Sequence, residues 1–177
     1  MITMTHPRWP AQIRGPQVSL QAVQAEAIAA DWLEEAAQAI AGRAAPCPLQ
    51  ARLDEGDAVF WIHPLEQDSG AVGALSGRLA DADGSRILIW TWLAIDAHWR
   101  HYGYGGASIP LFEDAARELG AVSAHVPLPS DNGVALYFWL RLGYVPDRAP
   151  VLPRDLPAGV AADAIWMRRS LLKPERE

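Results

Sequence analysis

One arginine and three glycines form a turn near the middle of the chain whose residue types suit a phosphate. Arg100 is followed by Gly103, Gly105 and Gly106. Glycine adopts a positive φ without steric cost and lets a ligand approach the backbone closely. A helix that begins at such a turn offers free N–H groups and the positive end of its dipole, which suits phosphate or pyrophosphate. The spacing alone leaves two interpretations open, phosphate binding and a plain tight turn.

The residues on either side predict the two elements that hold this turn. Arg86 to Ile95 is a dense apolar run, rich in β-branched and aromatic residues, which predicts a strand buried on both faces. Apolar residues then recur at helical spacing, so a helix is predicted after Gly105 as far as Glu118. Pro110 falls early in this helix and removes one hydrogen bond, so we expect a kink near Gly106.

The rest of the chain has the pattern of a mixed α/β protein. Strands are predicted at 18–23, 57–64, 71–80, 121–128, 144–145 and 164–171, and helices at 24–40 and 133–142. Asp83 and Gly84 predict a hairpin turn that leads into the 86–95 strand, so the middle strands should form an antiparallel meander. The segments 44–50 and 146–163 are predicted loops, and a loop as long as the second is often functional.

Composition excludes several classes of protein. The 177 residues fit one domain, which we expect to span 1–177 with a loose lead-in at 1–15 and a frayed tail at 173–177. A net charge of −6 without any Lys/Arg cluster disfavours nucleic acid and membrane-surface partners. The first residues do not resemble a signal peptide, and no apolar run approaches the ~20 residues that span a bilayer. We therefore expect a cytoplasmic protein.

Cysteine and tryptophan content adds two expectations. Cys47, the single cysteine, stands between two prolines and is interpreted as a lone thiol in a loop, and no metal site is predicted. Most of the eight tryptophans should be core residues, because indole has a large apolar area. Some could instead line an apolar pocket or a contact between the subunits of a homodimer.

Two motifs together resemble a known enzyme family. The segment from Leu93 to Gly106 resembles the acyl-CoA-binding motif of the GNAT superfamily of N-acyltransferases, Arg/Gln-x-x-Gly-x-Gly/Ala after a strand. Asn132, followed eleven residues later by Gly143 and Tyr144, resembles the second motif of that family. The match covers about residues 17 to 171 in the order of elements and is specific between about 86 and 144.

The resemblance implies both a fold and a cofactor. The implied fold is α/β (α+β), with a mixed, mostly antiparallel central sheet that is splayed around an acyl-CoA site and flanked by helices. Acetyl-CoA, or another short acyl-CoA, would lie between the strand ending near Ile95 and the strand 121–128. The backbone of Leu93 and Ile95 would flank the acyl and pantetheine portion. Ala94 and Trp139 are assigned to the same site.

The resemblance also assigns residues to the polar parts of the cofactor. Asn132 would hydrogen-bond the pantetheine arm, and Arg100 would open the phosphate-binding turn; a surface ion pair is the alternative for this arginine. The pyrophosphate would be cradled by backbone amides, because a polyanion on an acidic protein needs local N–H donors. These amides belong to His101, Tyr102, Gly103, Tyr104, Gly105 and Gly106.

The implied reaction is a direct transfer of the acyl group. A deprotonated amine would attack the thioester carbonyl, and the backbone N–H of Ile95 would hold the oxyanion. A general base must take a proton from the ammonium, and a general acid can protonate the departing thiolate. The acceptor would be a primary amine of a small molecule or a peptide.

The chain departs from the family at both of the usual acid–base positions. Trp139 stands four residues before Gly143, where many members carry a tyrosine as the acid, and an indole N–H is no acid near neutral pH. Pro127 stands five residues before Asn132, where some members carry a glutamate as the base.

His125 is the predicted substitute for the missing base. It lies two residues before Pro127 and therefore faces the same side of the strand. Its ordinary pKa near ~6.5 suits a base at neutral pH. A histidine satisfied by packing, or exposed on the strand, is the alternative.

Other ionisable residues have plainer explanations. Asp96 and His98, at the exit of the 86–95 strand, are interpreted as surface loop residues. Asp54, Glu55 and Asp57 could attract a cationic acceptor, although a solvated turn explains them as well.

Two functions of different classes therefore remain. The first is an acyl-CoA N-acyltransferase that uses His125 or a chain of waters as base, because positioning and oxyanion donors supply much of an acyl-transfer rate. The second is an acyl-CoA-binding or regulatory domain of the same fold with little or no catalysis, which the missing tyrosine and glutamate favour. The fold alone does not decide between them.

Overall fold

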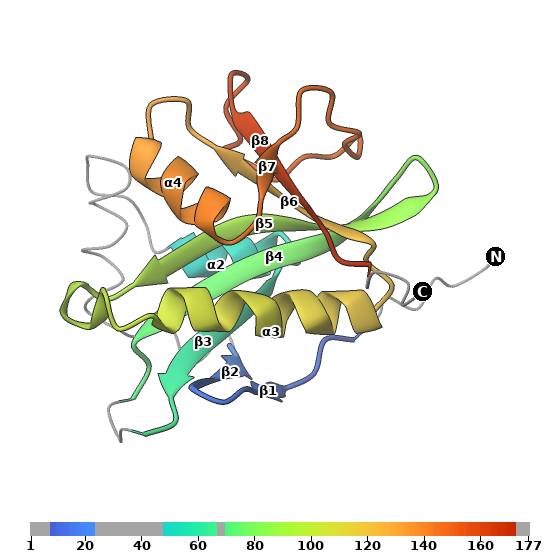
Figure 1. Cartoon of the computed structure of the whole chain (residues 1–177). Helices are drawn as coiled ribbons and strands as arrows, with labels where there is room; N and C mark the ends of the chain where they lie inside the picture. Colours follow the sequence, from blue (N-terminus) through green and yellow to red (C-terminus); the bar gives the residue numbers. More distant parts are fainter. Residues whose placement is uncertain (1–7, 24–47, 67–69, 173–177) are drawn as a thin grey trace, which may run out of the picture.

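An eight-stranded sheet organises the part of the chain that the computed structural model describes, residues 8–23, 48–66 and 70–172. The strand order is β1-β2-β3-β4-β5-β6-β8-β7 (Figure 1). The strands are β1 (Gln12–Arg14), β2 (Val18–Ala22), β3 (Ala58–Pro64), β4 (Gly73–Ala82), β5 (Ser85–Ile95), β6 (Ser123–Leu128), β7 (Val145–Pro146) and β8 (Ile165–Ser170). The helices of the described residues are α2 (Pro48–Asp54), α3 (Tyr104–Glu118) and α4 (Gly133–Arg141), and η2 (Ala97–Trp99) is a 3-10 turn.

The sheet is mostly antiparallel, as the sequence predicts. Among the strands of the described residues, only β5 and β6 pair in parallel. Their register is short: it begins at Ile87 opposite Ser123 and ends at Ile89 opposite His125. β5 continues to Ile95 and β6 to Leu128 without further pairing to each other. The two strands therefore diverge toward their carboxyl ends and open a gap in the sheet (Figure 1).

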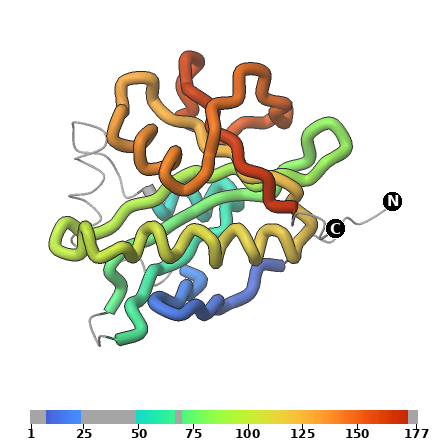
Figure 2. The backbone as a smooth tube through the Cα atoms, viewed as in Figure 1, coloured from blue at the N-terminus to red at the C-terminus, as the bar shows by residue number. Residues whose placement is uncertain are grey.

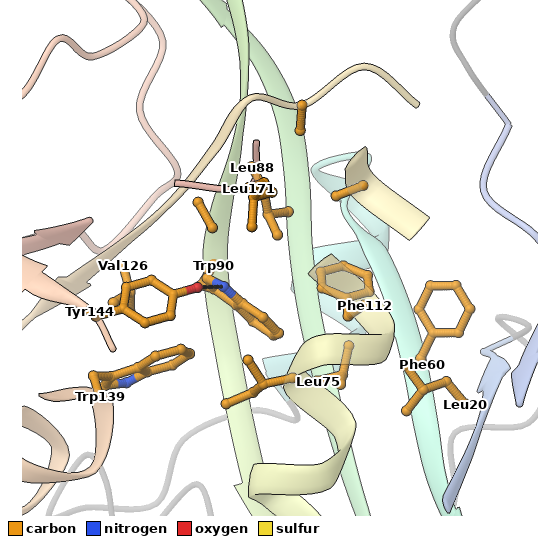
Figure 3. Packing of buried hydrophobic residues seen from close by; sticks show 14 of the residues in the cluster. Leu20, Phe60, Leu75, Leu88, Trp90, Phe112, Val126, Trp139, Tyr144 and Leu171 are labelled. Carbon is orange, nitrogen blue, oxygen red and sulfur yellow. Dashed lines mark hydrogen bonds between the residues drawn. The ribbon is translucent and has the colours of Figure 1, made fainter. Parts of the chain in front are cut away.

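The larger core lies between the sheet and α3, on what we call the front face. Figure 2 shows α3 crossing this face along the middle strands. Phe112 of α3 packs against Phe60 of β3 and Trp90 of β5, with ring centroids 5.7 and 4.9 Å apart (Figure 3). The stripe of Ile109, Phe112 and Ala116 that predicted the helix is fully buried here. A buried phenylalanine contributes roughly 1.5–3 kcal/mol of burial free energy.

Residues that alternate with this core form a second cluster on the opposite side, the rear face of the sheet. Val59 and Trp61 of β3 pack there with Ala74 of β4 and with Leu49 of α2. Successive strand residues point to opposite faces, so α2 covers the sheet from the side away from α3.

Most predicted elements are confirmed, with boundaries shifted by a few residues. The hairpin between β4 and β5 turns at Asp83 and Gly84, whose φ angles of 48° and 76° are both positive, as a two-residue primed turn requires. α3 runs through Pro110 as one helix. The predicted helix 24–40, Cys47 and the tail 173–177 lie outside the described residues.

Two predictions about loops are wrong. Residues 12–14 of the supposed lead-in form β1, which adds to the edge of the sheet beside β2 and carries no apolar alternation of its own. Helix α2 begins at residue 48, within the segment 44–50 that was predicted to be a loop. Proline is well tolerated in the first turn of a helix, so Pro48 marks a helix start rather than a loop. No helix in the described ranges is long and apolar enough to cross a membrane.

Candidate functional site

A cleft of about 780 Å³ lies where the end of β5, the glycine turn and the first turns of α3 and α4 meet. Ten of the residues assigned to the acyl-CoA site line it: Leu93, Ala94, Ile95, Arg100, His101, Gly103, Tyr104, Gly105, Gly106 and Asn132. Six residues that had not been assigned to the site complete the lining: Trp99, Val134, Ala135, Phe138, Arg141 and Leu142. The cleft lies at the gap that the separation of β5 and β6 opens in the sheet.

The glycine turn leaves the start of α3 open to the cleft. Gly103 is the N-cap of α3 and has a φ of 85°, a conformation that favours glycine. No side chain caps this end, and no acidic residue lies in the first turn. The first N–H groups of a helix have no partner within the helix, so those of Tyr104, Gly105 and Gly106 are available to an anion in the cleft.

The edge of β5 presents a second row of backbone groups to the gap. The N–H of Asp96 donates to Val72 O at 3.0 Å, toward β4. Hydrogen-bonding direction alternates along a strand, so the peptide groups of Leu93 and Ile95 point the other way, into the gap. Arg100 reaches this edge, where its Nε donates to Ile95 O at 3.2 Å.

A β-bulge makes this orientation possible. Farther back along β5, Arg86 O accepts from the N–H of Val122, so the even-numbered residues face β6 there. The register of β4 with β5 then shifts between Ser76 and Gly77, which leaves Thr91 without a partner residue. The extra residue, Thr91, reverses which residues point their backbone N–H and C=O groups toward β6. Beyond Thr91, the backbone groups of the odd-numbered residues face the gap.

Asn132 uses part of its side chain to start α4. Its Oδ1 accepts from the N–H of Ala135 at 3.0 Å, the usual contact of an N-cap asparagine. The side-chain NH2 group is the remaining donor, and the residue lines the cleft.

Charge in the cleft is opposite in sign to that of the whole chain. Arg100 and Arg141 line it, whereas no aspartate or glutamate of the described residues does. A chain with net charge −6 thus presents a locally cationic cleft with free amide donors. This arrangement suits a polyanion.

Two of the predicted cofactor residues do not line the cleft. Tyr102 is 62% exposed and stacks on Tyr104, with ring centroids 5.9 Å apart and an interplanar angle of 9°. Trp139 is 5% exposed and packs against Trp90 and Tyr144 in the front core (Figure 3).

The structure does not bring His125 to the cleft. On β6, Ala124 and Val126 belong to the front core, so His125 points to the rear face, where it is 3% exposed. It lines a separate cavity of about 230 Å³ together with Asp147 and Arg168. Its Nε2 lies 2.9 Å from Ser123 Oγ, and its Nδ1 has no partner. Burial lowers the pKa of His125, and the charge of Arg168 lowers it further while that of Asp147 opposes this.

The other ionisable candidates have mainly structural roles. Asp96 caps η2 by accepting from the N–H of His98 at 3.0 Å, and His98 is exposed, in keeping with surface loop residues. Asp57 is buried and accepts from Arg78 Nε at 2.6 Å. Glu55 accepts from Nη2 of the same arginine at 2.7 Å. Glu55 and Asp57 therefore belong to an ion-paired cluster with a buried carboxylate, and not to the solvated turn that was one of the predicted explanations.

A buried polar network behind the cleft was not predicted. Glu113 of α3 accepts from Tyr144 Oη at 2.5 Å and from Arg169 Nη1 at 3.0 Å, and Trp90 Nε1 donates to Tyr144 Oη at 2.7 Å (Figure 3 shows the Trp90–Tyr144 bond). Burial raises the pKa of Glu113, although its bond from Tyr144 and the charge of Arg169 work against this. The sequence signal was present, because Glu113 lies four residues after Ile109 on the buried stripe of α3.

Comparison with known proteins identifies the fold. No family model matches the chain, and no curated protein sequence matches it. Similar solved structures include a protein from Chromobacterium violaceum described as a probable acetyltransferase of the GNAT family, with a TM-score of 0.69 and 18% identity over 97% of this chain and 93% of the other. A GNAT-family acetyltransferase from Staphylococcus aureus has a TM-score of 0.61 and 15% identity over 88% and 99%.

A third similar structure contains a ligand. It is the toxin AtaT bound to the C-terminus of the antitoxin AtaR and to acetyl-CoA, with a TM-score of 0.54 and 12% identity over 87% of this chain and 93% of the other. At such identities the likeness concerns the arrangement of the backbone. The chain has the fold of the GNAT-family acetyltransferases.

Proposed function

We propose that the chain transfers an acyl group, acetyl in the simplest case, from acyl-CoA to a primary amine. The observation that carries this proposal is the meeting of two backbone donor sets at one cleft. These are the uncapped first turn of α3 and the edge of β5 at Leu93 and Ile95. The fold shared with GNAT-family acetyltransferases, one of the similar structures holding acetyl-CoA, supports the choice of cofactor.

Each wall of the cleft has a role in this proposal. The amides at the start of α3 bind the pyrophosphate, with Arg100 and Arg141 adding positive charge. The pantetheine arm follows the edge of β5 and receives a hydrogen bond from the Asn132 amide. The thioester carbonyl then lies at the gap, where the backbone N–H of Ile95 stabilises the oxyanion.

The reaction is a single displacement at the thioester carbon. The neutral amine forms the N–C bond, the C–S bond breaks, and the thiolate leaves with CoA. The ammonium form of the amine first loses one proton to water, which gives the neutral nucleophile. After attack the nitrogen loses a second proton, which converts the thiolate into a thiol, and the amide product keeps the remaining N–H. His125 has no part in these steps, because it lines another cavity on the rear face of the sheet.

An acyl-CoA-binding domain with little catalysis is the second candidate. It is favoured by one observation: among the described residues that line the cleft there is no carboxylate to serve as a base. Under this alternative the cleft would bind acyl-CoA with the same contacts, and no acyl transfer would follow.

Release of free thiol from acetyl-CoA in the presence of an amine panel separates the two candidates. We expect thiol to appear in proportion to N-acetylated product with at least one class of amine and at the background rate without amine. Tight binding of acetyl-CoA with background thiol release across a broad panel would favour the binding domain. Absence of acetyl-CoA binding would contradict both candidates.

A further inference from the structure

Thr91, the extra residue of the β5 bulge, lies where β5 and β6 part. Pairing of these strands ends at Ile89, two residues earlier, and Leu93, two residues later, lines the cleft. Trp90 points into the front core, and Trp92 packs on the rear cluster. Ser76 follows Leu75 of the front core on β4 and so points to the rear face, and Thr91 bonds to Ser76 and to Asp57. The Thr91 side chain therefore lies on the rear face of the sheet, near the point where β5 and β6 part.

The hydrogen bonds of Thr91 fix the direction of its hydroxyl proton. Thr91 Oγ1 lies 2.6 Å from Asp57 Oδ2, and a carboxylate oxygen only accepts, so the threonine proton points to Asp57. Ser76 Oγ lies 2.7 Å from Thr91 Oγ1 and must then be the donor of that bond. Thr91 Oγ1 thus gives one hydrogen bond and receives one, and its second lone pair stays free to accept another.

Burial distinguishes Thr91 from its two partners. The side chain of Asp57 is fully buried, and Ser76 is fully buried as well, whereas Thr91 is partly exposed. Thr91 is therefore the member of this trio that a ligand can reach.

The charged residues around Thr91, Ser76 and Asp57 balance one another, so their contribution is to orient the Thr91 hydroxyl. Asp57 is paired with Arg78 Nε at 2.6 Å, and Glu55 is paired with Arg78 at 2.7 Å and with Arg52 at 3.3 Å. Two carboxylates face two guanidinium groups, which leaves no net charge to attract a cationic acceptor. Asp57 is held in place and in turn holds the Thr91 hydroxyl.

We propose that Thr91 Oγ1 accepts a hydrogen bond from the acceptor amine and holds its nitrogen at the thioester carbon, with Asp57 as the positioning residue. This inference rests on the proposed acyl transfer. An attacking amine still carries N–H groups after its first deprotonation, so it can donate to Thr91 while its lone pair points at the carbonyl. A primary amine, the proposed acceptor, supplies such an N–H throughout the attack.

Thr91→Val tests the proposal, because valine keeps the β-branched shape and removes only the hydroxyl. With an amine that the wild-type protein acetylates, we expect kcat/KM for the amine to fall about tenfold, the worth of one hydrogen bond to the reacting group. The dissociation constant for acetyl-CoA should stay within about twofold, and Thr91→Ser should restore most of the rate. Asp57→Asn should lower kcat/KM for the amine in the same direction.

Four results would overturn the proposal. Thr91→Val with unchanged kcat/KM for the amine would remove Thr91 from acceptor binding. Loss of acetyl-CoA affinity in parallel with activity would show that Thr91 only maintains the bulge, and so would failure of Thr91→Ser to restore the rate. If the wild-type protein itself releases no thiol with any amine, the proposed transfer fails and this inference fails with it.

Discussion

Replacing Gly106 by glutamate should lower the affinity for acetyl-CoA at least about 100-fold and at the same time raise the stability of the protein. Gly106 lies in the first turn of α3 and lines the cleft, and a Cβ atom at this position meets no atom within 4 Å beyond the adjoining backbone of its own helix. A carboxylate there would occupy the anion site and repel the pyrophosphate, and each tenfold loss of affinity corresponds to about 1.4 kcal/mol.

The gain in stability has separate causes. Glycine inside a helix costs roughly 0.5–1 kcal/mol relative to a residue with a side chain. A negative charge near a helix N-terminus adds roughly 0.3–1 kcal/mol. Gly106→Glu should therefore melt at a higher temperature than the wild-type protein although it binds the cofactor far more weakly.

Gly106→Gln is the matched control, since it has the same size without the charge. Calorimetric titration with acetyl-CoA and thermal melts of the three proteins check the prediction. Gly106→Gln should retain more affinity than Gly106→Glu. Equal affinity of Gly106→Glu and the wild-type protein would show that acetyl-CoA does not use the start of α3.

Tyr144→Phe should destabilise the protein by about 2–4 kcal/mol. Tyr144 is fully buried and lies between two polar groups: it accepts from Trp90 Nε1 at 2.7 Å and donates to Glu113 at 2.5 Å. Removing the hydroxyl leaves a buried indole N–H without its acceptor and a buried carboxylate with Arg169 as its remaining partner. Leaving one buried polar group unsatisfied costs about 1–3 kcal/mol, and more for a charged one.

Tyr137→Phe serves as the control for this change. Tyr137 is 63% exposed on α4, so loss of its hydroxyl should alter stability by less than about 0.5 kcal/mol. Denaturant unfolding of both variants measures the difference. A Tyr144→Phe variant as stable as Tyr137→Phe would show that the buried network contributes nothing to the fold.

Local sequence signals were sufficient for the elements that build the cleft. The apolar run 86–95 and the stripe of Ile109, Phe112 and Ala116 predict β5 and α3, because burial imposes their periodicity. The glycine turn between them requires a positive φ at Gly103. The split sheet and the grouping of ten cofactor residues were implied by the resemblance to the GNAT motifs, Asn132 included, and not by these local signals.

Features that depend on the partner strand could not be predicted in this way. The alternation of side chains along a strand correctly places His125 on the same face of β6 as Pro127. Its position relative to the gap, however, depends on how β6 is paired with β5. His125 lies opposite Ile89, at the closed end, and Leu93 lies beyond the bulge. The bulge itself depends on the pairing of β4 with β5, so the unpaired Thr91 and the alternation it reverses are not visible in a single sequence.

Edge elements and buried charges were missed for other reasons. β1 is held by hydrogen bonds to β2 rather than by apolar side chains, so it leaves no periodic pattern. Asp57 looks like a surface carboxylate in the sequence, whereas Glu113 lies on the buried stripe of α3 but has no partner that the sequence identifies. Their burial depends on Arg78 and Arg169, which are distant in the chain. The sequence could suggest such pairs only after the sheet order was known.

The most direct test of the acyl-CoA site is a titration of ¹⁵N-labelled protein with acetyl-CoA, followed by amide resonances. If acetyl-CoA binds in the cleft, we expect the largest shifts at His101 to Gly106 and at Leu93 and Ile95, with the resonance of Ser123 little changed. Shifts that cluster around Ser123 and Asp147, which line the cavity at His125, while the glycine turn stays unchanged, would contradict it, and so would the absence of any shift.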